Sequence, residues 1–262
     1  MSLTLDDRLI LITGASSGIG EACARLCAAQ GARLILAARR VERLELLAKE
    51  LTHLYGKEHL VLRLDVRNHE EVQKTFAGLK AEWSAIDVLV NNAGLALDTL
   101  PLQQGLEAHW DIMIDTNIKG LLYVTRAVLP GMLEREQGHI VNIGSIAGLE
   151  YYPNGNVYAA TKHAVHALSK SMRLDTLGSN IRVTEIAPGA VETEFSEVRW
   201  QDKERAKAFY QDFKSLEAHD VADAILYCIC CPQHVNIEQL VIMPTVQASA
   251  NHLARTIPIL ND

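Results

Sequence analysis

The sequence has 262 residues, with 32 acidic and 25 basic side chains and a formal net charge of −7. This length suits one sizeable α/β domain or two small ones, and neither the ordinary composition nor the mild negative charge indicates a nucleic-acid-binding surface. No apolar run reaches the roughly 18 residues that a membrane span needs, and no basic stretch precedes the apolar part of the N-terminus, so we expect neither a membrane helix nor a secretory signal.

Short apolar runs alternate along the chain with longer amphipathic segments. The predicted strands are residues 8–13, 33–38, 60–66, 86–94, 138–145, 181–189 and 239–244. We expect helices between them, the first two over residues 18–30 and 41–55. This alternation predicts an α/β fold with a doubly wound parallel sheet of about seven strands and helices on both faces. We expect a single domain over 1–262, with a less regular segment near 190–215 and a C-terminal tail after residue 243.

The five cysteines do not have the spacing of metal ligands. Cys23 and Cys27 are one helical turn apart, and Cys228, Cys230 and Cys231 crowd the end of an apolar segment. Neither group has a histidine or a second cysteine pair at the distance that a zinc site needs. We therefore predict reduced, partly buried thiols in a reducing compartment, and no metal site.

A glycine-rich segment, TGASSGIG (13–20), lies between the first predicted strand and the first predicted helix. Glycines let the backbone turn sharply and approach a phosphate, whose charge the N-terminal end of the helix then holds. Gly14 can make the turn, Gly18 and Gly20 open the helix, and Ser16 and Ser17 can donate hydroxyl hydrogen bonds. The spacing is G-x-x-x-G-x-G, so a purely structural turn is the alternative. Its place at the first strand–helix junction favours dinucleotide binding.

The end of the second predicted strand indicates which nucleotide is bound. An acidic residue there would bind the ribose 2′-hydroxyl of NAD, whereas arginine suits the 2′-phosphate of NADP. Arg39 and Arg40 stand at this position, and no carboxylate occurs before Glu42. We expect NADP; the alternative is two solvated arginines at a helix start.

Two further strand ends carry residues that could contact the nucleotide. Asp65, or the neighbouring backbone at Val66, is expected at the adenine edge. The small residues of NNAG (91–94) let a cofactor lie against the carboxyl edge of the sheet. We expect contacts from Asn92, Ala93 and Gly94, while Asn91 serves equally well as a structural amide that ties two strands together.

Tyr158 and Lys162 are four residues apart in a predicted helix and therefore share one face. A free phenol has a pKa of about 10, and a nearby cation lowers it. We expect Lys162 to lower the pKa of Tyr158 and make it a general acid–base, with a second role for the lysine at the nicotinamide ribose. An ordinary surface Tyr–Lys pair is the alternative.

Ser145 follows the fifth predicted strand, so it belongs at the same edge of the sheet. There its hydroxyl can bind the substrate oxygen and steady the charge that develops on it, although a lone serine after a strand is more often a turn residue. Asn117 lies in a predicted helix, where an asparagine that caps backbone and kinks the helix is the simplest interpretation. His139 and His163 have no motif position and are expected to be structural or on the surface.

An acidic substrate would need a donor for its carboxylate. Arg199 is our candidate, because it follows the segment expected to cover the nicotinamide, and a solvated arginine is the alternative. Tyr151, Tyr152 and Asn156 precede the tyrosine of the predicted catalytic helix and are expected to line the pocket. Residues 191–215 have much charge and little periodic pattern, which predicts a mobile substrate lid.

The chain resembles the short-chain dehydrogenase/reductase family. The matching motifs are TGASSGIG (13–20), NNAG (91–94), Asn117 in DTNIKG, Ser145 in NIGS, Tyr158 and Lys162 in YAATK, and APGAVETEF (187–195). They occur in the family's order and cover nearly the whole chain. The resemblance implies a Rossmann-type fold and a catalytic set of Asn117, Ser145, Tyr158 and Lys162, with Asn117 in a lysine–water proton relay. It also implies cofactor contacts from Ile19, Pro188, Gly189, Val191 and Thr193.

A closer resemblance, in the segments GHIVNIGSIAG, GNVYAATK, TEFSEVR and HVNIEQLVIMP, is to the NADP-dependent 3-hydroxy acid dehydrogenase branch. It implies NADP, a homotetramer, and interconversion of a 3-hydroxyl and a 3-oxo group, with serine, allo-threonine or malonic semialdehyde as model substrates. We expect a cytoplasmic enzyme with a small-molecule substrate and no nucleic-acid or membrane partner. The alternatives are a reductase of a larger or cyclic carbonyl compound and a non-catalytic NADP-sensing protein.

Overall fold

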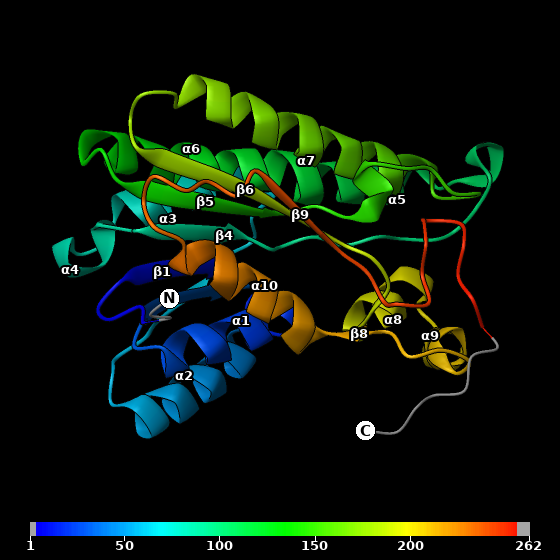
Figure 1. Ribbon diagram of the computed structural model, residues 1–262, viewed down its shortest axis with the longest axis horizontal. Helices are drawn as coiled ribbons and strands as arrows, with labels where there is room; N and C mark the ends of the chain where they lie inside the picture. The colour runs from blue at the N-terminus through cyan, green and yellow to red at the C-terminus, as the bar shows by residue number, and fades with distance from the viewer. Residues whose placement is uncertain (1–3, 256–262) are drawn as a thin grey trace.

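The computed structural model describes residues 4–255, and a seven-stranded parallel sheet runs through its centre (Figure 1). The strands are β1 (Leu9–Thr13), β2 (Arg33–Ala38), β3 (Leu60–Arg63), β4 (Val88–Asn91), β5 (Gly138–Ile143), β6 (Ile181–Pro188) and β9 (Gln239–Ile242). Their order is β3-β2-β1-β4-β5-β6-β9, so the winding reverses between β1 and β4. All seven predicted strands are confirmed. Four of them, predicted over 60–66, 86–94, 138–145 and 239–244, end two or three residues earlier, because the chain leaves the sheet there to form loops at its carboxyl edge.

Helices cover both faces of this sheet. The helices within residues 4–255 are α1 (Gly18–Ala29), α2 (Val41–Tyr55), α3 (His69–Ala77), α4 (Ala81–Ser84), α5 (Glu107–Ile114), α6 (Leu121–Glu134), α7 (Asn156–Asp175), α8 (Glu194–Trp200), α9 (Lys203–Tyr210) and α10 (Ala218–Cys230), with the short 3₁₀ segments η1 (Leu102–Gln104) and η3 (Ile146–Gly148) and the π-helical segment η2 (Asp115–Gly120). Helices α1, α2 and α10 pack on one face, and α3, α6 and α7 pack on the other (Figure 1). The predicted doubly wound α/β fold is therefore confirmed.

The central strands are apolar along their whole length because each face of the sheet meets a helical layer. In β1 all five residues are buried. Ile10 and Ile12 enter the core under α1 and α10, whereas Leu9 and Leu11 enter the core under α6 and α7. This two-sided burial holds the carboxyl ends of the strands, and the loops that follow them, in fixed positions.

The segment near 190–215 is more regular than its sequence pattern suggests. It contains α8 and α9, flanked by β7 (Val191–Glu192) and β8 (Leu216–Glu217), which pair with each other as a separate two-stranded sheet. The two helices lie beyond the end of the main sheet, near the red C-terminal segment (Figure 1). Phe209 packs against Trp200 and Phe213, with ring centroids 5.4 and 5.8 Å apart. Such contacts order helices too short to show a clear period in the sequence.

The C-terminal segment after β9 folds back against this region. Gln247 and Leu253 form an isolated antiparallel bridge, and Arg255 Nη1 donates a hydrogen bond to the carbonyl oxygen of Phe209 at 3.1 Å. The predicted tail after residue 243 continues to residue 262, and its last part, 256–262, lies outside the described residues.

The five cysteines are free, and all except Cys230 are buried, as predicted for structural thiols. Burial raises the pKa of Cys228 to about 12, so this thiol stays protonated. Within residues 4–255 none of the helices has the length and apolar character to cross a bilayer.

Candidate active site

A cavity of about 580 Å³ lies along the carboxyl edge of the sheet, where open α/β folds bind ligands. The predicted site residues that line it are Gly14, Ser16, Ser17, Gly18, Ile19, Arg39, Arg40, Asp65, Val66, Asn92, Ala93, Gly94, Ser145, Tyr152, Tyr158, Lys162, Pro188, Gly189, Val191, Thr193 and Arg199. Four predicted site or pocket residues lie outside this lining: Gly20, Asn117, Tyr151 and Asn156. The structure thus gathers residues from seven sequence segments at one edge.

The glycine turn after β1 is held by the side chain of Asn92. Its Nδ2 donates hydrogen bonds to the carbonyl oxygens of Thr13 at 2.9 Å and Gly14 at 3.2 Å. Gly14 has a φ of +66°, and a Cβ there would lie 2.9 Å from Asn92 Nδ2, so only glycine fits this turn. A Cβ on Gly20 would lie 2.5 Å from the carbonyl oxygen of Gly14. Gly20 therefore packs beneath the turn and lies outside the cavity lining, and its contact with the cofactor stays a prediction.

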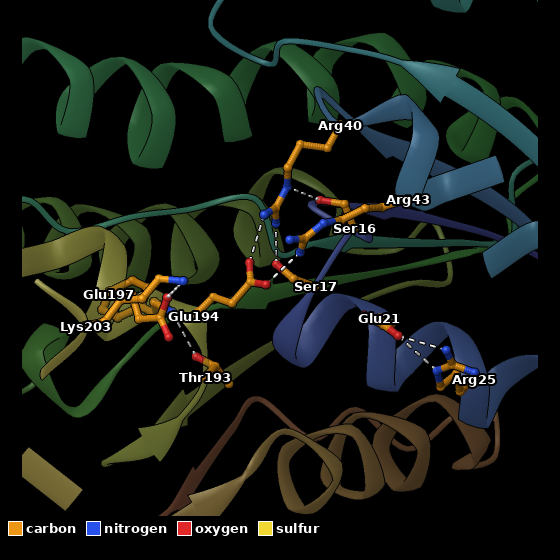
Figure 2. Close-up of polar contacts among 11 residues, drawn as sticks. Ser16, Ser17, Glu21, Arg25, Arg40, Arg43, Thr193, Glu194, Glu197 and Lys203 are labelled. Carbon is orange, nitrogen blue, oxygen red and sulfur yellow. Dashed lines mark hydrogen bonds and ion pairs between the residues drawn. The ribbon is translucent and has the colours of Figure 1, made fainter. Parts of the chain in front are cut away.

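Arg40 joins the glycine turn to helix α8. Its Nε and Nη2 donate to the hydroxyl groups of Ser16 at 3.2 Å and Ser17 at 2.6 Å, and its Nη1 donates to Glu194 Oε2 at 2.8 Å (Figure 2). Arg43, one turn further along α2, donates to the other oxygen of Glu194 at 2.6 Å. Arg39 is exposed at the rim of the cavity. Three guanidinium groups at the end of β2 suit a phosphate monoester.

The carboxylate of Asp65 is already engaged. Arg67 Nη2 donates to its Oδ2 at 2.6 Å, and the backbone N–H of Arg67 donates to Oδ1 at 3.1 Å. The hydrogen bond from the Arg67 guanidinium lowers the pKa of Asp65. Either the Asp65 carboxylate or the neighbouring backbone was predicted to contact the adenine. Because the carboxylate is bound to Arg67, the backbone at Asp65 and Val66 is the better candidate for that contact.

Two buried asparagines act as ties. Asn117, in the π-helical η2, donates from Nδ2 to the Leu95 carbonyl at 2.8 Å and to Thr161 Oγ1 at 3.0 Å, and its Oδ1 accepts from the Leu95 N–H at 2.9 Å. Both of its amide hydrogens are used, so the capping interpretation is confirmed, and its distorted helix agrees with the predicted kink.

Asn91 donates to Asn142 Oδ1 at 2.9 Å and so ties β4 to β5, which confirms its structural interpretation.

Tyr158, Ser145 and Lys162 converge on one end of the cavity. Tyr158 is 9% exposed in the first turn of α7, and Lys162 lies one turn further on. The Lys162 ammonium donates to the carbonyl oxygen of Ile143 at 2.8 Å and lies 5.9 Å from the centroid of the Tyr158 ring. Ser145 Oγ accepts from the N–H of Ala147 at 3.1 Å and hydrogen-bonds the phenol of Tyr158. A phenol, a hydroxyl and an ammonium group thus surround a space in which an alcohol or carbonyl oxygen can be held.

The expected effect of Lys162 on the phenol is wrong. Burial raises the pKa of Tyr158, and the opposing influences come first from the positive charge of Arg199 and then from the hydrogen bond with Ser145. Lys162 has its own ammonium turned toward the Ile143 carbonyl, and burial lowers its pKa to about 8. The physical reason is desolvation, which disfavours the charged form of both groups. The phenol is therefore protonated at neutral pH and ready to donate.

Arg199 reaches the tyrosine from helix α8. Its guanidinium carbon lies 4.8 Å from the centroid of the Tyr158 ring and 5.1 Å from that of Phe195. One of its nitrogens, Nη2, donates to the Tyr152 hydroxyl at 3.3 Å, and Nε is buried with no hydrogen-bond partner within residues 4–255. A buried donor without a partner is costly, so an anionic ligand at this position would be stabilised.

The other residues expected near the pocket serve different purposes. Tyr151 is 75% exposed and stacks on His163 with centroids 4.9 Å apart, and Asn156 donates to the carbonyl oxygen of Leu100 at 2.9 Å. Neither residue lines the main cavity, because Tyr151 is turned toward solvent and Asn156 is tied to the backbone of Leu100. His163 also contacts the backbone of its own helix, and His139 is buried in β5, which confirms the structural interpretation of both histidines.

Glu185, in β6, was not among the predicted site residues and lies against the backbone that precedes Ser145. It is 2% exposed, and its Oε2 lies 2.6 Å from His166 Nδ1 and accepts from Gln239 Nε2 at 2.8 Å. A Cβ on Gly144 would lie 2.2 Å from Glu185 Oε1, so the carboxylate sits directly against the backbone before Ser145. Its charge opposes the effect of burial on the pKa of Lys162. A carboxylate inside a predicted buried strand was the signal that could have revealed it.

Two other residues that line the cavity, Glu194 and Gln247, could not be predicted from the sequence around them. Glu194 meets Arg40 and Arg43 only because α8 packs beside the start of α2. Gln247, from the C-terminal segment, accepts a hydrogen bond from the Ala190 N–H at 2.8 Å and lines the cavity.

Known proteins that are similar to this chain include dehydrogenases and a reductase. A family model described as short chain dehydrogenase matches residues 8–204. The chain is 48% identical over 244 residues to the NADP-dependent 3-hydroxy acid dehydrogenase YdfG of Shigella flexneri, covering 92% of this chain and 97% of that protein. It is 47% identical over 242 residues to sulfoacetaldehyde reductase 2 of Chromohalobacter salexigens, covering 92% of this chain and 95% of that protein.

A solved structure described as the closed form of serine dehydrogenase complexed with NADP⁺ is also similar. It superimposes with a TM-score of 0.89 at 47% identity, over 92% of this chain and 97% of that chain.

Proposed function

The chain belongs to the short-chain dehydrogenase family, and we propose that it uses NADP(H) to interconvert the hydroxyl group of a small 3-hydroxy acid and the corresponding carbonyl group. It is an NADP-dependent oxidoreductase that acts on CH–OH groups. The observation that carries the substrate class is Arg199, a cation beside Tyr158 whose buried Nε has no hydrogen-bond partner among residues 4–255.

The residues at the carboxyl edge fit NADP. The glycine turn lines the cavity with Gly14, Ser16, Ser17 and Gly18, and Arg39 and Arg40 stand where the 2′-phosphate is expected. We propose that Ser16, Ser17, Gly18 and Ile19 hold the pyrophosphate, that Val66 and the segment Asn92–Gly94 border the adenosine, and that Pro188, Gly189, Val191 and Thr193 border the nicotinamide. When bound, the nicotinamide supplies the hydride chemistry.

Tyr158 is the proposed general acid–base. In reduction its hydroxyl gives a proton to the carbonyl oxygen, and in oxidation it takes the proton of the alcohol. Ser145 orients the oxygen and steadies its developing charge. Lys162 holds a positive charge behind the tyrosine, at the proposed ribose position. Since burial raises the pKa of Tyr158, the protonated phenol suits the reductive direction at neutral pH.

Asn117 is proposed to act through position alone. Its side chain is fully engaged with Leu95 and Thr161, so it holds the loop after β4 against α7, the helix that carries Tyr158 and Lys162.

Arg199 is the proposed anchor for the substrate's acidic group. The guanidinium lies beside the tyrosine that contacts the reacting oxygen, which suits a molecule whose carboxylate and carbonyl are separated by one carbon. Malonic semialdehyde and the oxidation products of serine or allo-threonine have this form. Because α8 carries Arg199, we propose that residues 190–215 close over the substrate as a lid.

We also propose a homotetramer working in the cytoplasm. The outer edge of β9 carries the partly exposed Val241, a surface that a second copy of the chain could cover. Five free cysteines suit a reducing compartment. Light scattering after size exclusion would test the assembly; a monomer at micromolar concentration would contradict it.

The substrate proposal is tested by following NADPH oxidation with a panel of carbonyl compounds. We expect small 3-oxo acids to react fastest, with NADH a poorer reductant. Sulfoacetaldehyde tests whether a sulfonate replaces the carboxylate. Preference for cyclic ketones or bulky aldehydes would favour the alternative reductase, and NADPH binding without turnover of any carbonyl would favour a sensing protein.

A further inference from the structure

We propose that Glu194 is a specificity-determining residue that competes with the 2′-phosphate of NADP for the guanidinium groups of Arg40 and Arg43. This inference rests on the proposed function, because it takes NADP as the cofactor. It adds two residues, Arg43 and Glu194, to the part of the site that distinguishes NADP from NAD.

The first argument is the geometry of the contact. The two oxygens of Glu194 are shared between two arginines, with Oε2 2.8 Å from Arg40 Nη1 and Oε1 2.6 Å from Arg43 Nη1 (Figure 2). Arg40 is further oriented by the hydroxyl groups of Ser16 and Ser17. The carboxylate therefore occupies the side of both guanidinium groups on which an anion of similar geometry would bind.

The second argument is the position of Glu194 in the chain. It is the first residue of α8, whose N-cap residue Thr193 receives the N–H of Phe195 at 3.3 Å. A Cβ on Gly18 would lie 3.4 Å from the Cβ of Thr193, so the start of α8 packs against the glycine turn. Glu194 is thereby held at the border between the proposed phosphate sites and the proposed lid.

The third argument is the balance of charge. Both ion pairs are partly exposed, with side chains 39–48% accessible, and pairs of this kind are weak. A phosphate monoester carries a charge of about −1.5 to −2 at neutral pH, more than a carboxylate. It can displace Glu194 from the arginines, whereas the neutral ribose hydroxyls of NAD cannot. Glu194 would then weaken NADP binding by competition and leave NAD almost unaffected.

The test is a titration of the full chain with nucleotides, read by protein or NADPH fluorescence or by calorimetry. In Glu194→Gln the side chain keeps its size but loses its charge. We expect the dissociation constant for NADPH to fall about 3- to 10-fold and that for NADH to change less than about twofold. Adenosine 2′,5′-bisphosphate should tighten by the same factor and 5′-ADP should not, which places the effect at the 2′-phosphate without any turnover.

A matched control is available one turn along the same helix. Glu197 faces Lys203 at 3.9 Å and not the arginines, so Glu197→Gln removes one charge from α8 without touching the proposed site (Figure 2). Equal tightening in both variants would reduce the effect to net charge and overturn the proposal. Unchanged or weaker NADPH binding in Glu194→Gln would also overturn it. Failure of the wild-type chain to prefer NADPH over NADH would instead contradict the proposed cofactor, so the two failures are distinguishable.

Discussion

The guanidinium of Arg199 lies 4.8 Å from the ring centroid of Tyr158, although the two residues belong to different helices, α8 and α7. Its positive charge is the largest influence that opposes the effect of burial on the pKa of the phenol. Arg199 also lines the cavity in which substrate is expected. One side chain of the proposed lid can therefore both tune the acid–base group and hold an acidic substrate.

Replacing Tyr158 by phenylalanine removes the proposed proton donor but keeps the ring, whose centroid lies 5.7 Å from that of Phe195. We expect turnover to fall by about 10²- to 10⁴-fold, the usual contribution of a positioned general acid–base. NADPH binding, measured by fluorescence titration, should stay within about twofold of the wild type. Turnover close to that of the wild type would reject the assignment of Tyr158.

Arg199→Gln should affect acidic substrates selectively. Loss of one charge-assisted hydrogen bond is expected to lower kcat/KM for a small 3-oxo acid by about 10- to 100-fold. A neutral carbonyl substrate, assayed in parallel, should lose much less. The matched control is Arg205→Gln on α9, because Arg205 is exposed and donates to Thr99 Oγ1 at 3.0 Å. A similar loss in both variants, or an equal loss for neutral substrates, would contradict the carboxylate anchor.

Lys162→Met should stabilise the folded protein at pH 7 while abolishing activity. The pKa of Lys162 is about 8 in the folded protein, compared with 10.5 for an unperturbed lysine. Between pH 8 and pH 10.5 the unfolded chain binds more protons at this lysine than the folded protein does, so the free energy of unfolding of the wild type rises with pH across this window. The cost of burying the ammonium is therefore fully present below pH 8. That cost is on the order of 3 kcal/mol, less the lost hydrogen bond to Ile143.

Denaturant unfolding at pH 7 and pH 9.5 checks this expectation. The advantage of Lys162→Met over the wild type should shrink at the higher pH. Lys170→Met, at an exposed position of the same helix, should show no such change. A variant that is less stable than the wild type at pH 7 would contradict the pKa of the buried lysine.

Glu185→Gln should change the pH dependence of the reaction. The negative charge of Glu185 favours the protonated form of Lys162, so its loss should let the lysine release its proton at lower pH. We expect the alkaline limb of the kcat/KM profile to move to lower pH. Glutamine keeps the shape that packs against Gly144, and Glu238→Gln, at an exposed glutamate paired with Arg173, serves as the control. An unmoved alkaline limb in a folded Glu185→Gln protein would show that Glu185 does not act through this charge.

The strands of the sheet and several residues of the site could be predicted from local sequence. Seven apolar runs predicted seven strands, because a strand covered on both faces must be apolar throughout. Gly14 could be identified because only glycine makes that turn at a strand–helix junction. Arg39 and Arg40 could be identified because they directly follow β2, which lies beside β1 in the sheet. Two short helices in 190–215 were missed because aromatic packing orders them, not their own periodicity.

The sequence by itself determined which chemical groups reach the carboxyl edge of the sheet: their positions at strand ends and their helical spacing are local properties. Only the tertiary structure decided how these groups behave. Burial and the charge of Glu185 set the pKa of Lys162, and α8 brings Arg199 to Tyr158 and Glu194 to Arg40. Desolvation and charge depend on what surrounds a side chain in space, and the residues that surround these come from distant parts of the chain.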